Sequence, residues 1–134
     1  TYNMPDKYNA IDWNLKHKYN DLVEYYKGLI ALRKAHPAFS LGTAEAVREH
    51  LSFIDNNNEA AIGFVLDKLE GIDSAKRIVV LMNGSRKAEK FNIPAGKYKW
   101  ITDGSEWNVN GMGTLNTKGE IEVPAITGII LAEF

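Results

Sequence analysis

Side chains in the stretch from residue 20 to residue 37 follow the three-and-four spacing that puts them on one helical face. The residues on this face are Leu22, Tyr26, Leu29, Ile30 and Arg33. Three apolar residues widen it beyond the stripe of an ordinary surface helix: Val23, Leu32 and Ala35. We therefore expect a helix that is covered on more than one side. Strand-like sequence follows the helix but does not precede it, so part of its cover is expected to be missing on the N-terminal side.

The sequence marks both ends of this helix. Asn20 is a favourable N-cap, and Pro37 ends the helix because the residue before a proline is steered out of helical dihedral angles. Charged residues match the helix dipole, acidic near the start and basic near the end: Asp21, Glu24, Arg33, Lys34 and His36. Local pattern and end signals thus agree on one long helix.

After this helix the pattern changes to short extended segments. Residues 47–53 alternate, with apolar side chains on one side and polar side chains on the other. The Asp-Asn-Asn-Asn run at 55–58 predicts a turn, and 61–66 is the expected second arm of a hairpin. The continuous apolar run at 77–82 is typical of a central strand that is buried on both faces.

Four more short strands are predicted, at 89–93, 98–101, 120–123 and 126–132, with turn residues between them. The Asn- and Gly-rich segment 107–116 fits either a weak edge strand or a long loop. Many short strands at this spacing indicate a mainly β fold, an antiparallel sandwich or barrel.

The first 19 residues show neither a helical nor a strand period, and their turn-forming residues predict a loop. Large rings occur in it beside short carboxylates and amides: Tyr2, Asp6, Tyr8, Asn9, Asp12, Trp13 and Tyr19. Carbohydrate sites use this chemistry, because ring faces stack on sugars while carboxylates and amides bind hydroxyl groups. The structural alternative is that Ile11 and Trp13 fix the loop to a core while Asp6 and Asp12 cap turns. Spacing alone favours the structural alternative.

Composition indicates a globular domain without affinity for nucleic acids or membranes. Of the 134 residues, 45% are hydrophobic and 25% are charged, and the net charge of −1 offers no basic surface for phosphate groups or anionic lipids. No apolar run approaches the roughly 20 residues of a membrane-spanning helix, and no signal-peptide pattern is present. We therefore expect no nucleic-acid or membrane partner, and the sequence assigns no cellular compartment.

The search for catalytic and metal-binding residues is negative. Cysteine is absent, and His17, His36 and His50 are too far apart for a short metal-ligand motif, so solvated or helix-ending roles are expected for them. No phosphate-binding glycine loop and no nucleophile elbow occurs. Asp6 and Asp12 are the one carboxylate pair among aromatic residues, and they do not make a complete glycosidase pair. We predict no catalytic residue, no metal and no cofactor.

Two motifs carry a resemblance to a known family: YNMPDKYNAIDW at residues 2–13 and YYKGLIALRKAHPAF at residues 25–39. In this order and at this distance they resemble the C-terminal part of a type I pullulanase, a debranching enzyme of the α-amylase superfamily. The resemblance implies that residues 1–38 are the last loop and helix of a catalytic (β/α)8 barrel. It also implies that residues 39–134 form the antiparallel β-sandwich that follows the barrel.

The same resemblance implies hydrolysis of α-1,6-glucosidic branch linkages in pullulan, amylopectin or glycogen, with retention at the anomeric carbon. The family's catalytic carboxylates lie on earlier barrel strands, so this chain is expected to be inactive without the missing catalytic barrel. By the resemblance, Asp6 binds a glucose hydroxyl group, Asn9 supports it and Tyr2 lines the cleft. Asp12 and Trp13 are expected to fix the loop to the barrel.

The expected role of the β-sandwich is to cover the last barrel helix, and two other functions stay open. One is a non-catalytic carbohydrate-binding module with a surface at Tyr98, Trp100, Trp107 and Asn108, although a tryptophan in a strand is more often part of a core. The other is an interaction domain, for which residues 1–38 would be dispensable. A further hypothesis is that the apolar helix face promotes self-association of the chain when its barrel is missing.

Overall fold

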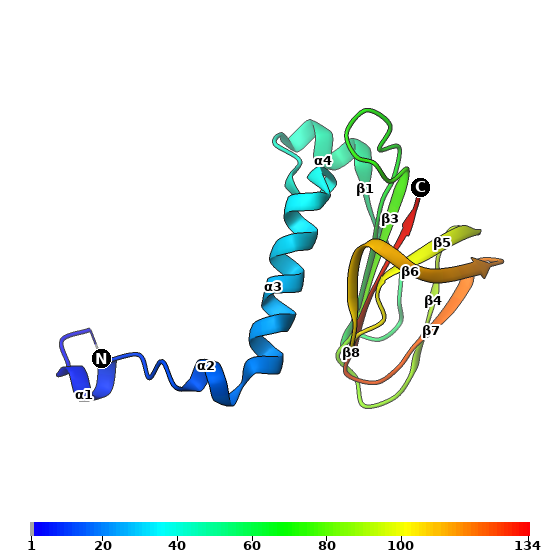
Figure 1. The fold of residues 1–134 in the computed structure, drawn as a ribbon. Helices are drawn as coiled ribbons and strands as arrows, with labels where there is room; N and C mark the ends of the chain where they lie inside the picture. The colour runs from blue at the N-terminus through cyan, green and yellow to red at the C-terminus, as the bar shows by residue number, and fades with distance from the viewer. Residues whose placement is uncertain (1) are drawn as a thin grey trace.

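The computed structural model describes residues 2–134 and shows a β-sheet body with one long helix alongside it (Figure 1). Residues 2–19, which we call the arm, extend away from this body (Figure 1). The helices are α1 (Asp6–Asn9), α2 (Leu15–Lys18), α3 (Asn20–Ala35), the 3-10 helix η1 (Pro37–Ser40) and α4 (Ala44–His50). The strands are β1 (Leu51–Ile54), β2 (Ala61–Leu66), β3 (Arg77–Asn83), β4 (Glu89–Asn92), β5 (Gly96–Thr102), β6 (Trp107–Thr117), β7 (Glu120–Val123) and β8 (Thr127–Glu133).

Six strands form one antiparallel sheet in the order β1-β2-β3-β8-β5-β6, and β4 and β7 pair as a separate two-stranded sheet. β3 lies between β2 and β8, with Val80 opposite Phe64 on one side and Ile130 on the other. β6 is an edge strand of the large sheet, and α3 contacts it. This contact sets the position of the long helix on the body.

One face of the large sheet is covered by the small sheet. Val79 and Leu81 of β3 are fully buried in a cluster with Phe91 of β4 and Val123 of β7. The two sheets therefore form the layers of a sandwich around a common hydrophobic core.

The other face of the large sheet is covered by helical and loop segments. Ile78 and Val80, the alternate residues of β3, are buried in a second cluster with Leu32 of α3 and Leu69 of the loop after β2. Because successive side chains of a strand point to opposite faces, β3 contributes to both clusters. The strand predicted at 77–82 is thus confirmed as a central strand that is buried on both faces.

The prediction of a mainly antiparallel β fold is confirmed. The strands predicted at 61–66 and 120–123 have these bounds in the structure, and the segment at 107–116 belongs to the edge strand β6. The division of the chain into barrel tail and β-sandwich at residues 38 and 39 stays a prediction.

The extended segment predicted from residue 47 is wrong in its first half. Ala44–His50 form helix α4, and extension begins only with Leu51–Ile54 of β1. The Thr43 hydroxyl group accepts a hydrogen bond from the Ala46 amide at 3.1 Å and so caps the helix. This cap and the helix-favouring alanine, glutamate and arginine residues outweigh the alternating pattern that indicated a strand.

The start of α3 also differs from the prediction. Asn20 is the first helical residue rather than the N-cap; Tyr19 occupies the cap position, and no side chain there bonds to the helix. The reason is α2, which ends at Lys18 and leaves one residue before α3 begins. The N-terminal stretch predicted as a loop therefore contains two short helices, α1 and α2.

Candidate functional site

The three predicted sugar-binding residues lie together on the arm, around α1. Asp6 and Asn9 are the first and last residues of α1, and Tyr2 precedes it. The Asn9 side-chain amide donates a hydrogen bond to the Met4 carbonyl oxygen at 2.7 Å, which closes this segment on itself. Every residue from 2 to 22 is exposed. The structure therefore places all three side chains on one short, accessible segment, and their roles in sugar binding stay predictions.

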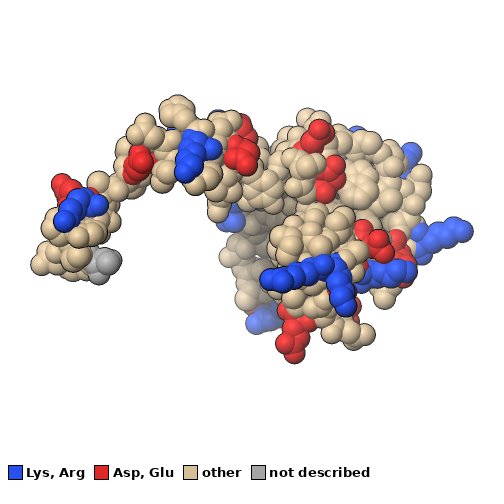
Figure 2. Space-filling model, turned by 90° about the horizontal axis from the view of Figure 1, so that it is seen from below, with Lys and Arg blue, Asp and Glu red and all other residues tan. Residues whose placement is uncertain are grey.

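The arm and the first turns of α3 carry what we call the apolar arm surface. Its large side chains are each at least 44% exposed: Tyr2, Met4, Tyr8, Ile11, Trp13, Leu15, Tyr19, Leu22, Tyr26 and Ile30. Figure 2 shows the arm projecting from the body, with scattered charged side chains on the face in view. A surface of this kind, with so many large apolar groups in one segment, is typical of an interface.

The structural alternative for the N-terminal residues holds only in part. The Asp12 carboxylate caps a turn, because it accepts a hydrogen bond from the Asn14 amide at 3.0 Å. Trp13 and Ile11 are 73% and 69% exposed, so they do not fix this segment to a core formed by residues 2–134.

α3 packs on the body through one face. Leu32 is its one buried residue, and it joins the second hydrophobic cluster. On the outward face Leu22, Tyr26 and Ile30 are 53%, 58% and 53% exposed. We expected this outward face to be covered as well, but no part of residues 2–134 covers it.

A glycine in the middle of α3 permits a close contact between this helix and β6. A Cβ atom on Gly28 would lie 2.8 Å from Cγ of Trp107, closer than side chains approach. Tyr25 meets the same indole edge-on, with ring centroids 5.2 Å apart. Gly28 was not among the predicted site residues, although an isolated glycine within a helical pattern signals a close packing contact.

The end of α3 is held by a buried polar contact. His36 is 1% exposed; its Nδ1 lies 2.8 Å from Oδ1 of Asp73, and its Nε2 lies 3.1 Å from the Val109 carbonyl oxygen. The Asp73 carboxylate also accepts hydrogen bonds from the amides of Ala38 at 3.1 Å and Ala75 at 2.9 Å. His36 is thus helix-ending, as expected, but buried rather than solvated. Its partner was missed because it lies on the loop after β2, 37 residues along the chain.

Among residues 2–134, three carboxyl groups have pKa values below their ordinary range, and each serves the fold. Burial raises the pKa of Asp73, but hydrogen bonds from two backbone amides and from His36 outweigh burial and hold the pKa low. Burial also raises the pKa of Asp67, but the hydrogen bonds from the Arg77 side chain and the Lys68 amide, together with the positive charges of both residues, outweigh it. Hydrogen bonds from the backbone amides that follow Asp103 lower its pKa. A general acid needs a raised pKa, so none of the three is suited to that role.

No group of histidine and carboxylate side chains in residues 2–134 is arranged to hold a metal ion. His17 is exposed on the arm, and Nδ1 of His50 lies 3.1 Å from the Asp67 carbonyl oxygen. Within the same described range, no helix has the length and apolar character needed to span a membrane.

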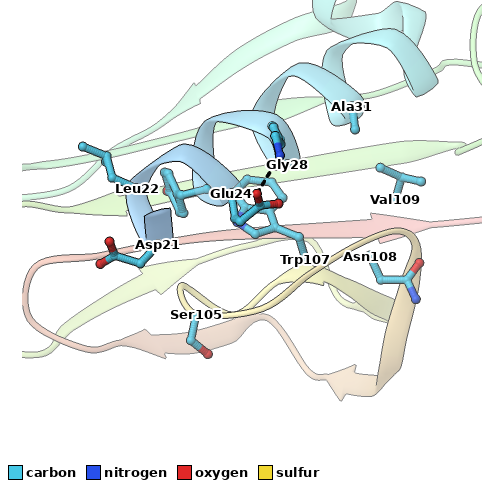
Figure 3. A pocket seen from close by; sticks show the side chains of 11 residues that line it. Asp21, Leu22, Glu24, Gly28, Ala31, Ser105, Trp107, Asn108 and Val109 are labelled. Atoms are coloured by element: carbon cyan, nitrogen blue, oxygen red, sulfur yellow. Dashed lines mark hydrogen bonds and ion pairs between the residues drawn. The ribbon is translucent and has the colours of Figure 1, made fainter. Parts of the chain in front are cut away.

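The predicted sugar-surface residues of the body lie in different environments. Tyr98 is 0% exposed and its hydroxyl group donates to the Pro94 carbonyl oxygen at 2.8 Å, so its ring belongs to the core and cannot stack on a sugar. Trp100 is half-buried against the same core. Trp107 packs against α3, and Asn108 beside it is exposed. Trp107 and Asn108 both line an open groove between α3 and β6 (Figure 3).

Comparison with known proteins shows which families and structures this chain resembles. Residues 47–106 match the family described as "Pullulanase, all-beta domain". The pullulanase of Bacillus subtilis (strain 168) is 31% identical over 127 residues, an alignment that covers 86% of this chain and 18% of that protein.

Solved structures of pullulanases have the same fold over nearly the whole chain. The pullulanase from Bacillus acidopullulyticus gives a TM-score of 0.87 at 30% identity, covering 98% of this chain and 16% of that one. The pullulanase from Anoxybacillus sp. LM18-11, complexed with maltotetraose, gives a TM-score of 0.82 at 30% identity, covering 99% and 18%. The likeness thus includes α3 and the arm, and the chain spans less than a fifth of the length of these relatives.

Proposed function

Residues 47–106 match the family described as "Pullulanase, all-beta domain", and from this match we propose that the chain is the C-terminal part of a pullulanase-type glycoside hydrolase. The whole enzyme cleaves α-1,6-glucosidic branch linkages in glucans of the pullulan, starch or glycogen type, with retention at the anomeric carbon. This chain supplies the β-domain and the last loop and helix of the catalytic barrel. It contains none of the catalytic carboxylates and is inactive alone.

The one-sided burial of α3 carries this proposal. Its inner face contributes Leu32 to the core of the body, whereas Leu22, Tyr26 and Ile30 are more than half exposed. Burying a large apolar side chain contributes roughly 1.5–3 kcal/mol, so an outer face of this kind has much to gain from a second partner. That partner is the barrel: residues 1–38 are its last loop and helix, and residues 39–134 are the sandwich that covers the helix.

The proposed substrate contacts lie on the arm. Asp6 accepts a hydrogen bond from a glucose hydroxyl group, Asn9 supports Asp6, and Tyr2 lines the cleft. Their common position around α1 and their exposure support this assignment. The Anoxybacillus pullulanase is complexed with maltotetraose, which supports a glucan as the ligand of the whole enzyme.

A chimera tests the proposal, in which this chain replaces the matching part of the Bacillus subtilis pullulanase. We expect the chimera to release reducing ends from pullulan, and the chain alone to release none. Asp6→Asn in the chimera should weaken activity, whereas Glu45→Gln on α4 of the body is the matched control and should not. A folded chimera without activity on pullulan or amylopectin would count against the proposal, and so would activity of the chain alone.

A further inference from the structure

An open groove runs between the first turns of α3 and the start of β6, away from the predicted contacts on α1. Its walls come from two elements that are far apart in sequence, with Asp21 and Gly28 on the helix and Trp107, Asn108 and Val109 on the strand (Figure 3). The volume of about 940 Å³ lies within the range of small-molecule binding sites.

The indole of Trp107 is the central apolar group of this groove. Gly28 lets the ring lie directly against the helix, and Tyr25 holds it edge-on, so its position is set by packing. Its Nε1 is buried and has no hydrogen-bond partner among the described residues. Buried polar groups in folded proteins ordinarily have a partner, so this N–H is an unmet donor within the packed junction of α3 and β6.

Two polar side chains with unused bonding capacity lie on either side of Trp107 (Figure 3). Asp21 has no hydrogen-bond or ion-pair partner in residues 2–134, in contrast to Glu24, which pairs with Lys27 at 2.6 Å. The Asn108 side-chain oxygen accepts from the Asn110 amide at 3.0 Å, which leaves the NH2 group of Asn108 available. The groove thus offers a carboxylate acceptor, amide donors and an aromatic ring.

This combination fits a neutral, polyhydroxylated ligand. Hydroxyl groups donate to a carboxylate and accept from an amide, while the apolar edge of a sugar contacts the ring. The ionised side chains that line the groove are Asp21, Glu24 and Lys27, so the local charge does not favour an anion. We propose that the groove binds a short α-glucan segment, as a second glucan site of the molecule. The choice of an α-glucan among sugars rests on the proposed function.

NMR of the 15N-labelled chain tests this site, because the chain has three tryptophans, at positions 13, 100 and 107, and hence three indole N–H signals. Titration with maltohexaose should shift the Trp107 signal and the Gly28 amide in a saturable manner and leave the Trp13 and Trp100 signals in place. Cellohexaose, with β-1,4 linkages, is the control ligand and should have no such effect.

Asn108→Ala should weaken the affinity for maltohexaose roughly two- to tenfold, as expected for the loss of one hydrogen bond. Asn116→Ala is the matched control, an exposed asparagine on the same strand that does not line the groove. The absence of a saturable Trp107 shift, an equal response to cellohexaose, or equal affinity of the two variants would overturn the proposal. An active chimera combined with any of these results would reject the groove site alone, whereas an inactive chimera would reject the proposed function.

Discussion

His36 ties α3 to the sheet body, because its ring contacts oxygen atoms of Asp73 and Val109. We expect His36→Ala to lower the free energy of unfolding by about 2–4 kcal/mol, since a buried carboxylate then loses its side-chain partner. Urea unfolding at pH 7 measures this change. His17→Ala on the exposed arm is the matched control and should change stability by less than about 0.5 kcal/mol. Equal effects of the two substitutions would contradict the role of His36.

Asp73 makes part of this stability dependent on pH. Its pKa in the folded state lies below the ordinary value of 3.8, so the carboxylate stabilises the fold above that pH. This contribution is lost as the pH falls through the lower, folded-state pKa. The difference in unfolding free energy between the wild type and Asp73→Asn should therefore be largest near neutral pH and shrink in acid. Urea unfolding across the acid range measures it, and a difference that grows on acidification would contradict this account.

Single residues differ in how far the sequence predicts them. The place of His36 at the end of the helix follows from Pro37 next to it, because that signal is local. Its bond to Asp73 bridges 37 positions and joins a helix end to a loop, so no local pattern announces it. Asp6, Asn9 and Tyr2 were found through a resemblance between motifs, and their roles depend on a ligand rather than on the fold.

At the scale of elements, the close packing of α3 on β6 depends on glycine at position 28, which has no side chain. Gly28→Ala should lower the free energy of unfolding by about 1–3 kcal/mol, because the new methyl group meets the Trp107 ring at 2.8 Å. This cost outweighs the gain of about 1 kcal/mol that alanine brings to a helix. Thermal unfolding provides the measurement.

Gly42→Ala is the control for that substitution, since no atom would lie within 4 Å of the added Cβ atom. It should leave the melting temperature unchanged or raise it slightly through the unfolded state. If Gly28→Ala stabilised the protein as much as Gly42→Ala, the close packing of helix and strand would be disproved.

A strand with a continuous run of buried residues was easy to predict. β3 reads as a strand because its continuous apolar run contributes to cores on both faces of the sheet. α4 was missed because four of its residues continue the alternating pattern of β1. Its cap at Thr43 lies before residues 47–53, the segment in which the alternation was recognised. β6 stayed undecided because an edge strand has few buried positions, and its packing against α3 is a contact distant in sequence.

For the molecule as a whole, the apolar arm surface predicts self-association of the isolated chain. Large apolar side chains that are exposed together gain free energy when a second copy covers them. Sedimentation velocity should show a sedimentation coefficient that rises with concentration. The double variant Tyr26→Lys with Ile30→Lys should remain monomeric, and a wild type that is monomeric at every concentration would contradict the prediction.

The central claim is that the outer face of α3 packs against a catalytic barrel in the whole enzyme, and chemical labelling of Tyr26 tests it most directly. Tyr26 is 58% exposed in this chain, and Tyr98, at 0%, is an internal control that should stay unreactive throughout. We predict that Tyr26 reacts in the isolated chain, under conditions in which the chain is monomeric, and is protected in the active chimera. Equal reactivity of Tyr26 in both proteins would contradict the account.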